Sequence, residues 1–131
     1  MSTISRPQNP ESNPRVKAVF NDIRATRGSD FINNLWHYLA FDENLLEKTW
    51  YDVKAIMTEK SNLDPITKEL IYIAVSITNS CVYCTRSHTA AAKKKGASDE
   101  MIKEMIDVVG IANQNNKLVE AYQVEVDEIY K

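Results

Sequence analysis

The fold is decided by residues 64–96, which read DPITKELIYIAVSITNSCVYCTRSHTAAAKKKG. Asp64 and Pro65 predict a helix start, because an aspartate caps free backbone N–H groups and a proline fits the first helical position. Apolar side chains then follow at helical spacing on one face, namely Ile66, Leu70, Ile73, Ala74 and Ile77. Ile71 and Val75 add a second apolar face, so most sides of this helix are expected to be buried.

A second helix is expected over residues 81–95, after Thr78-Asn79-Ser80, a run of residue types that favour helix N-termini. At about 100° per residue, Cys81, Cys84 and His88 would lie on one stripe roughly 60° wide. Both cysteines would then lie in the first turn. Unpaired N–H groups and the positive end of the helix dipole stabilise a thiolate there.

These residues form a candidate reactive site. Cys81 and Cys84 are the only cysteines of the chain, and His88 is one of its two histidines. Glu69 lies twelve residues before the first cysteine. Two neighbouring thiols, with an acid and an imidazole to move protons, are typical of thiol–disulfide or peroxide chemistry.

The rest of the chain also predicts helices, and no segment alternates as a strand would. We therefore predict an all-α, single-domain bundle of about seven helices over residues 14–131, behind a flexible polar tail at residues 1–13. The further apolar stripes are Val16, Val19, Phe20 and Ile23 between Pro14 and Gly28; Ile32, Leu35, Trp36 and Leu39 behind Ser29 and Asp30; Leu46, Trp50, Val53 and Met57 behind Asp42; Met101, Met105 and Val109 behind Ser98; and Leu118, Tyr122, Val126 and Ile129.

Composition excludes several classes. The 131 residues suit one domain, and a net charge of −2 argues against nucleic-acid binding. The longest apolar run, residues 71–77, is too short to span a membrane. No cationic segment followed by an apolar one opens the chain, so we expect a cytoplasmic protein, in which a close cysteine pair is more often catalytic or metal-binding than structural.

The spacing of Glu69, the Cys81-Val-Tyr-Cys84 quartet and His88 resembles the core motif of the AhpD-like alkylhydroperoxidases of the carboxymuconolactone decarboxylase superfamily. The flanking residues 63–65, 68–71 and 73–76 are similar too, and the resemblance covers roughly residues 30–110. It implies an AhpD-like helical fold. It also implies a thiol-dependent (alkyl)hydroperoxide reductase with an antioxidant role, for which we expect no cofactor and no metal.

The resemblance further implies residue roles. Cys84 would attack the hydroperoxide and become a sulfenic acid, and Cys81 would resolve it to a disulfide. Glu69 and His88 would form a proton relay. A dithiol reductant protein, lipoylated or thioredoxin-like, would restore the thiols. Peroxidase members carry a histidine at the position of Tyr83. The phenol of Tyr83 can donate a hydrogen bond but is a poor base, so we expect Tyr83 to be a supporting residue of the site.

Other interpretations stay open at this stage. Cys81, Cys84, His88 and His37 could hold zinc, although structural zinc usually takes ligands from two clusters. The cysteines could also be inert apolar residues, and Glu69 could be a surface residue. The chain could be a decarboxylase or lactone enzyme of the same superfamily, a redox sensor or a metal-binding scaffold. The run Lys93-Lys94-Lys95 is interpreted as a solvated face at a helix C-terminus.

Large apolar side chains exceed what a small bundle needs, notably Trp36, Tyr38, Leu39, Leu118, Tyr122 and Ile129. Contiguous apolar surface marks contacts, and closed homo-oligomers are its common use. Similar family members form trimers or hexamers, so we expect a homo-oligomer of one of these kinds.

Overall fold

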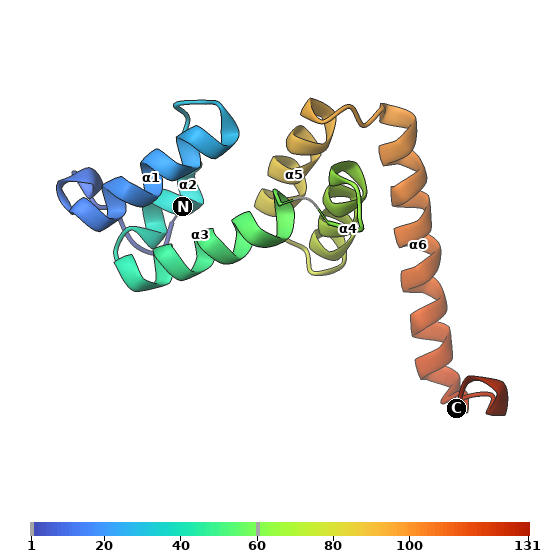
Figure 1. The fold of residues 1–131 in the computed structure, drawn as a ribbon. Coiled ribbons are helices and arrows are strands. Elements are labelled where there is room, and N and C mark those ends of the chain that lie inside the picture. Colours follow the sequence, from blue (N-terminus) through green and yellow to red (C-terminus); the bar gives the residue numbers. More distant parts are fainter. Residues whose placement is uncertain (1, 60) are drawn as a thin grey trace. The chain divides into compact units, whose positions relative to one another are not determined.

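A computed structural model describes residues 2–59 and 61–131. Across these residues all regular elements are helical, with six α-helices and two short 3-10 helices (Figure 1). The predicted all-α class is confirmed. No helix in this part of the chain is long and apolar enough to cross a membrane. The contacts divide the chain into two compact units, Met1–Glu59 and Lys60–Lys131.

The first unit contains a 3-10 helix η1 (Pro10–Ser12) and the helices α1 (Pro14–Arg27), α2 (Asn34–Leu39) and α3 (Glu43–Met57). Helix α2 begins later than the predicted start at Ser29 and Asp30. Those two residues instead complete the end of α1. The Ser29 N–H donates to the Arg24 carbonyl, and the Arg24 side chain donates to the Asp30 carbonyl. Arg24 also pairs with Glu11 at 2.7 Å. The division into a tail (residues 1–13) and a domain (residues 14–131) stays a prediction.

The core of the first unit is formed by the predicted apolar stripes. Its buried members are Val16, Val19, Phe20, Ile23, Ile32, Trp36, Leu46 and Trp50. The Trp36 and Trp50 rings meet edge to face with centroids 5.4 Å apart. Trp36 is 3% exposed, so it is a core residue and adds no surface patch. His37 packs edge-on against Phe20.

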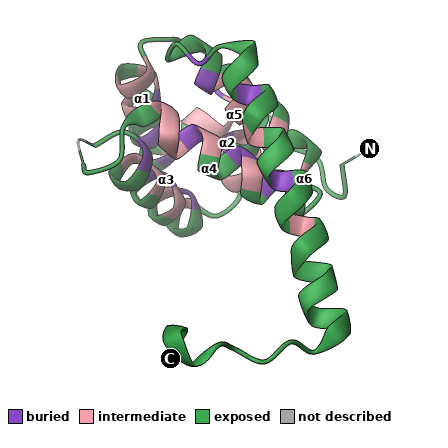
Figure 2. Cartoon of the chain, turned by 90° about the vertical axis from the view of Figure 1, so that its right-hand side faces the viewer, coloured by how far each residue is buried: buried purple, intermediate pink, exposed green. Residues whose placement is uncertain are grey.

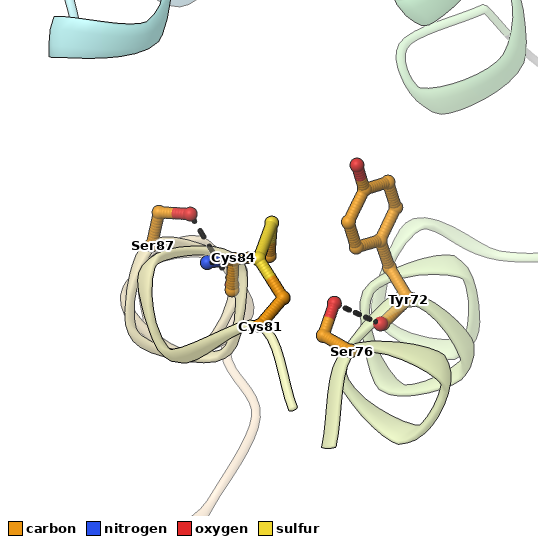
Figure 3. The surroundings of a disulfide bond; sticks show 5 residues. All are labelled: Tyr72, Ser76, Cys81, Cys84 and Ser87. Atoms are coloured by element: carbon orange, nitrogen blue, oxygen red, sulfur yellow. Dashed lines mark hydrogen bonds between the residues drawn. A yellow bond between two sulfur atoms is a disulfide. The ribbon is translucent and has the colours of Figure 1, made fainter. Parts of the chain in front are cut away.

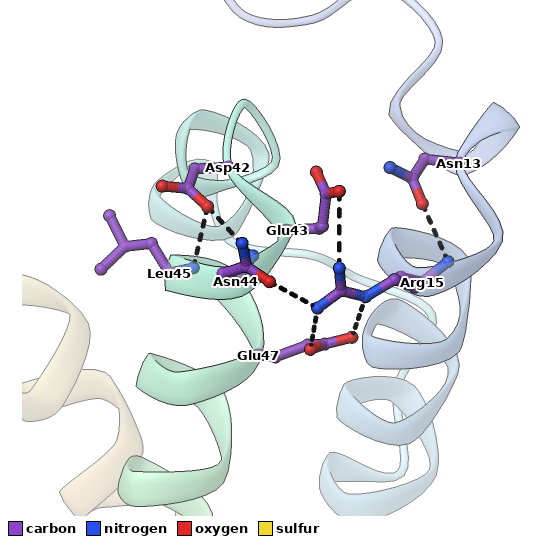
Figure 4. A network of polar contacts seen from close by, with 7 residues as sticks. All are labelled: Asn13, Arg15, Asp42, Glu43, Asn44, Leu45 and Glu47. Carbon is purple, nitrogen blue, oxygen red and sulfur yellow. Dashed lines mark hydrogen bonds and ion pairs between the residues drawn. The ribbon is translucent and has the colours of Figure 1, made fainter.

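Polar side chains join α1 to α3 at the edge of this core (Figure 4). The guanidinium of Arg15 donates to both carboxylate oxygens of Glu47, at 2.8 and 2.5 Å, and to Asn44 at 2.7 Å. Asn13 caps α1 and Asp42 caps α3, each by accepting backbone N–H groups. The two helix starts and their connection are thus fixed by one set of side chains.

The second unit contains α4 (Pro65–Thr78), α5 (Val82–Lys94) and α6 (Asp99–Tyr122), followed by the 3-10 helix η2 (Glu128–Tyr130). Asp64 and Ser98 cap α4 and α6 as predicted. The core lies between α4 and α5 around Ile73, Ala92 and Ala97, with Ile66, Leu70, Ile77 and Met105 packed against it.

Helix α6 replaces two predicted helices. The stripes around Met105 and Leu118 belong to one continuous helix, because the residues between them include no proline and Gly110 does not interrupt the backbone. The helix ends at Gln123, whose φ of 50° is left-handed, and Ile129 lies beyond it. Figure 2 shows the last turns of α6 and the following segment as exposed.

The turn between α4 and α5 is a paired C-terminal motif. The N–H groups of Ser80 and Cys81 donate to the carbonyls of Ile77 and Ser76, at 3.0 and 2.9 Å. This is the Schellman pattern, in which the residue after the C-cap adopts the left-handed conformation. Ser80 takes that place with φ 58°. The motif delivers Cys81 directly to the start of α5.

We predict that Ser80→Val lowers the free energy of unfolding by about 1–2 kcal/mol, because a β-branched residue resists the left-handed conformation. Ser80→Gly should be at least as stable as the parent, since glycine adopts a positive φ freely. Urea denaturation followed by circular dichroism measures both. Equal stabilities of the three proteins would contradict the assigned turn.

Candidate active site

The two cysteines are joined at the start of α5. Cys81 is the N-cap residue, and its Sγ accepts the Cys84 N–H at 3.2 Å. A disulfide links the two residues, whose Cα atoms are 5.4 Å apart. The N-cap is therefore Cys81 itself, whereas Thr78, Asn79 and Ser80 end α4 and join it to α5. The cysteines lie at the positive end of the helix, as predicted.

The disulfide lies on the side of α5 that faces α4 (Figure 3). Tyr72 and Ser76 stand opposite it on α4, where the Ser76 hydroxyl donates to the Tyr72 carbonyl at 2.8 Å. Ser76 is 4% exposed. The sulfur atoms thus lie beside the interface between two helices and close to its polar groups.

The predicted acid and imidazole are in direct contact. Nδ1 of His88 is 2.7 Å from Oε2 of Glu69, whose side chain is only 4% exposed. An ionised carboxylate only accepts hydrogen bonds, so Nδ1 carries the proton. In the neutral imidazole the Nε2 lone pair is then available as a base. His88 follows Cys84 by one helical turn, a spacing at which side chains are neighbours.

Glu69 has a second partner that the sequence analysis missed. Nζ of Lys95 lies 2.5 Å from its other oxygen, Oε1. Burial raises the pKa of Glu69, but the hydrogen bonds from His88 and Lys95 outweigh it and hold that pKa below its ordinary value. The lysine run is exposed at the end of the helix, as interpreted, but Lys95 also pairs with this buried carboxylate. Lys93 pairs with Asp99 at 2.7 Å.

Tyr72 is a further residue that the sequence analysis missed. Its ring stacks on the His88 imidazole with centroids 3.6 Å apart and planes 18° apart. A sequence signal existed for both missed residues. Tyr72 follows Glu69 by three positions and Lys95 follows His88 by seven, so each shares a helix face with a predicted site residue.

Two other residues were candidates from the sequence, Tyr83 and His37. Tyr83 is on the first turn of α5 and is 43% exposed. His37 belongs to the first unit, where it packs on Phe20. Among residues 2–59 and 61–131, no cluster of three or more His, Cys, Asp or Glu side chains could hold a metal ion.

An open hollow of about 270 Å³ adjoins the disulfide. It reaches Cys81 and is walled mainly by apolar atoms, with one cationic side chain, Arg86, at its lining. The remaining lining residues are Ser76, Ile77, Ser80, Val82 and Thr85. Cys81 therefore borders an open depression of the surface.

Comparison with known proteins gives this site a family context. The model of the carboxymuconolactone decarboxylase family matches residues 44–125, which include the whole site. The crystal structure of the alkylhydroperoxidase AhpD core from Rhodospirillum rubrum ATCC 11170 superposes with a TM-score of 0.95. That protein is 51% identical in sequence, and the match covers 99% of this chain and 97% of the other.

Two curated relatives match a shorter stretch. Uncharacterized protein YdfG of Bacillus subtilis (strain 168) is 40% identical over 45 residues, which are 34% of this chain and 31% of that protein. Uncharacterized protein 4 in cox locus of Paracoccus denitrificans is 41% identical over 44 residues, which are 34% of this chain and 40% of that protein. The match therefore spans well under half the length of each.

Proposed function

This chain belongs to the carboxymuconolactone decarboxylase family as an AhpD-like member, and from that premise we propose that it is a thiol-dependent alkylhydroperoxide reductase. One observation carries the proposal. A disulfide at the start of α5 lies one helical turn from a histidine that a buried carboxylate orients. The likeness to a structure named as an alkylhydroperoxidase core supports the same activity.

The oxidative half-reaction begins at Cys84. His88 Nε2 accepts the thiol proton, and the thiolate attacks the distal oxygen of the hydroperoxide. An S–O bond forms, the O–O bond breaks, and the alkoxide takes a proton to leave as an alcohol. Cys81 then attacks the Cys84 sulfenic acid, so that an S–S bond forms and water leaves.

The reductive half-reaction begins at Cys81, the cysteine that lines the hollow. A dithiol reductant, carried on a lipoylated or thioredoxin-like protein, attacks its Sγ and releases Cys84 as a thiolate. The second thiol of the reductant then displaces Cys81. In sum, hydroperoxide and dithiol become alcohol, water and the reductant's disulfide. Such a cycle suits a reducing compartment such as the cytoplasm.

Decarboxylation of a lactone is the activity that the family's name suggests, and we place it second. That chemistry does not use two thiols that can form a disulfide, whereas Cys81 and Cys84 are joined by one here. A redox sensor would need the same disulfide but would not need an acid–base pair such as Glu69 and His88 beside it. The Glu69–His88 contact therefore favours an enzyme over a sensor.

We also propose that the protein works as a homo-oligomer, either a trimer or a hexamer. Apolar residues on the second half of α6 and beyond it are strongly exposed, including Leu118 at 45%, Tyr122 at 78% and Ile129 at 84%. Exposed apolar surface of this kind is usually covered by a partner. Closed rings of identical chains would cover it.

The cysteine roles test the proposed function. Cys84→Ser should abolish peroxide consumption, because it removes the attacking thiol. Cys81→Ser should consume one equivalent and leave a sulfenic acid at Cys84 that a 1,3-diketone reagent labels, detected by mass spectrometry. The reverse pattern would exchange the two roles, and full turnover in both variants would end the redox proposal.

The proposed proton relay predicts that its loss slows the reaction of the reduced protein with peroxide. Glu69→Gln and His88→Ala should each slow the reaction of Cys84 with peroxide by about 10²-fold, as loss of a general acid–base group typically does. Stopped-flow measurements on the reduced protein give these rates. Glu104→Gln, which neutralises an exposed glutamate on α6, is the matched control and should react as the parent does.

Light scattering at micromolar concentration tests the assembly. We expect three or six times the 14.9 kDa of one chain. Tyr122→Glu should lower the assembled mass, because it places a charge in the apolar surface of α6. A parent protein that runs as a monomer would remove the oligomer from the proposal.

A further inference from the structure

We propose that Lys95 is a positioning residue for the proton relay: it holds one oxygen of Glu69 so that the other faces His88. This inference rests on the proposed function, since it assigns a part in the same site. Lys95 contacts the carboxylate of Glu69, so the part we assign to it is exerted through that residue.

The geometry separates the two carboxylate oxygens. Oε1 receives Lys95 Nζ at 2.5 Å, and Oε2 receives His88 Nδ1 at 2.7 Å. The last torsion of a glutamate side chain has a broad energy profile, so one partner alone leaves the carboxylate free to turn. Two partners on different oxygens fix its plane. The His88 ring is fixed in turn by Glu69 at its edge and by the Tyr72 ring on its face.

The backbone holds Lys95 in place for this contact. Lys95 is the C-cap residue of α5, and Gly96 follows it with a φ of 105°. The N–H groups of Gly96 and Ala97 donate to the carbonyls of Lys93 and Ala92, which closes a second Schellman motif. A cation is also favourable at this end of a helix. Its side chain is 32% exposed, so only the Glu69 end of the pair is buried.

The charge of Lys95 also keeps the carboxylate ionised. The charged groups that act on Glu69 are His88 and Lys95, both from α5. From α4 the nearby titratable ring is Tyr72, which stacks on His88, and from α6 the side chain packed on this core is Met105, which does not titrate. Without Lys95, burial would raise the pKa of Glu69 with only the histidine to oppose it. A protonated Glu69 would no longer orient the imidazole as a base.

The test measures the reactivity of Cys84 against pH. In the reduced Cys81→Ser protein, Cys84 is the only thiol, and its alkylation rate with iodoacetamide is followed from pH 5 to 10. Adding Lys95→Met should move the acid limb of this profile upward by about one pH unit, the low end of the shift that one nearby charge produces. The rate at neutral pH should fall about tenfold, the fold-change that one pH unit represents.

Matched variants separate positioning from general charge effects. Lys95→Arg should restore most of the parent profile, because it keeps a cation within reach of Oε1. Lys94→Met removes an exposed neighbouring charge and should leave the profile unchanged. If Lys95→Met does not fold by circular dichroism, Lys95→Gln takes its place, with the same shift expected.

A folded variant without the Lys95 charge whose acid limb matches the parent would overturn the inference. So would an equal shift in Lys94→Met. Peroxide consumption by the protein with both cysteines is measured separately. If the acid limb shifts but the protein consumes no peroxide, Lys95 is a positioning residue and the proposed function is wrong. If the protein consumes peroxide but the acid limb does not shift, the proposed function stands and the role of Lys95 is wrong.

Discussion

The buried carboxylate of Glu69 is the constraint on which the second unit depends. An ionised carboxylate away from water is costly unless it is paired and hydrogen-bonded. Both of its partners, His88 and Lys95, come from α5, whereas Glu69 itself comes from α4. The two helices must therefore pack in the one register that brings these three side chains together. The apolar core around Ile73 and Ala92 supplies the packing energy, and the carboxylate specifies the register.

The turn between α4 and α5 has only three residues, and it is compatible with the register that Glu69 requires. Because Ser80 adopts a left-handed conformation, the end of α4 is closed and α5 starts at once from Cys81. A longer connection would not define where the cysteines lie along α4. A short one fixes them next to Ser76 and Tyr72. The disulfide and the Glu69–His88 pair are thereby held by one pair of helices.

The sequence predicted those parts of the molecule that depend on local spacing. The helices of both units, the caps at Asp42, Asp64 and Ser98, and the pairing of two thiols within one turn all follow from residues a few positions apart. The continuity of α6 was missed because a polar stretch with a glycine resembles a break, although an exposed helix tolerates both.

The contacts of Glu69 could not be derived in the same way. Its partner Lys95 is 26 residues away along the chain. The seven-residue spacing places Lys95 on the same helix face as His88, but it does not show that this face meets Glu69. Only the packing of α4 on α5 determines this. The stack of Tyr72 on His88 has the same origin, since either ring alone could equally face solvent. Long-range partners of a buried charge are where a single sequence carries least information.

The two ends of α5 divide the chemistry between them. The N-terminal end carries Cys81 and Cys84, where the helix dipole favours a thiolate, and the C-terminal end carries Lys95, where it favours a cation. His88 lies between them and connects the sulfur end to the carboxylate on α4. Replacing the cysteines would remove the disulfide, whereas the Glu69–His88 contact involves neither sulfur atom and would stay. The cysteine pair is therefore the part of this helix on which the proposed peroxide reduction depends, and the carboxylate–histidine pair alone would not support it.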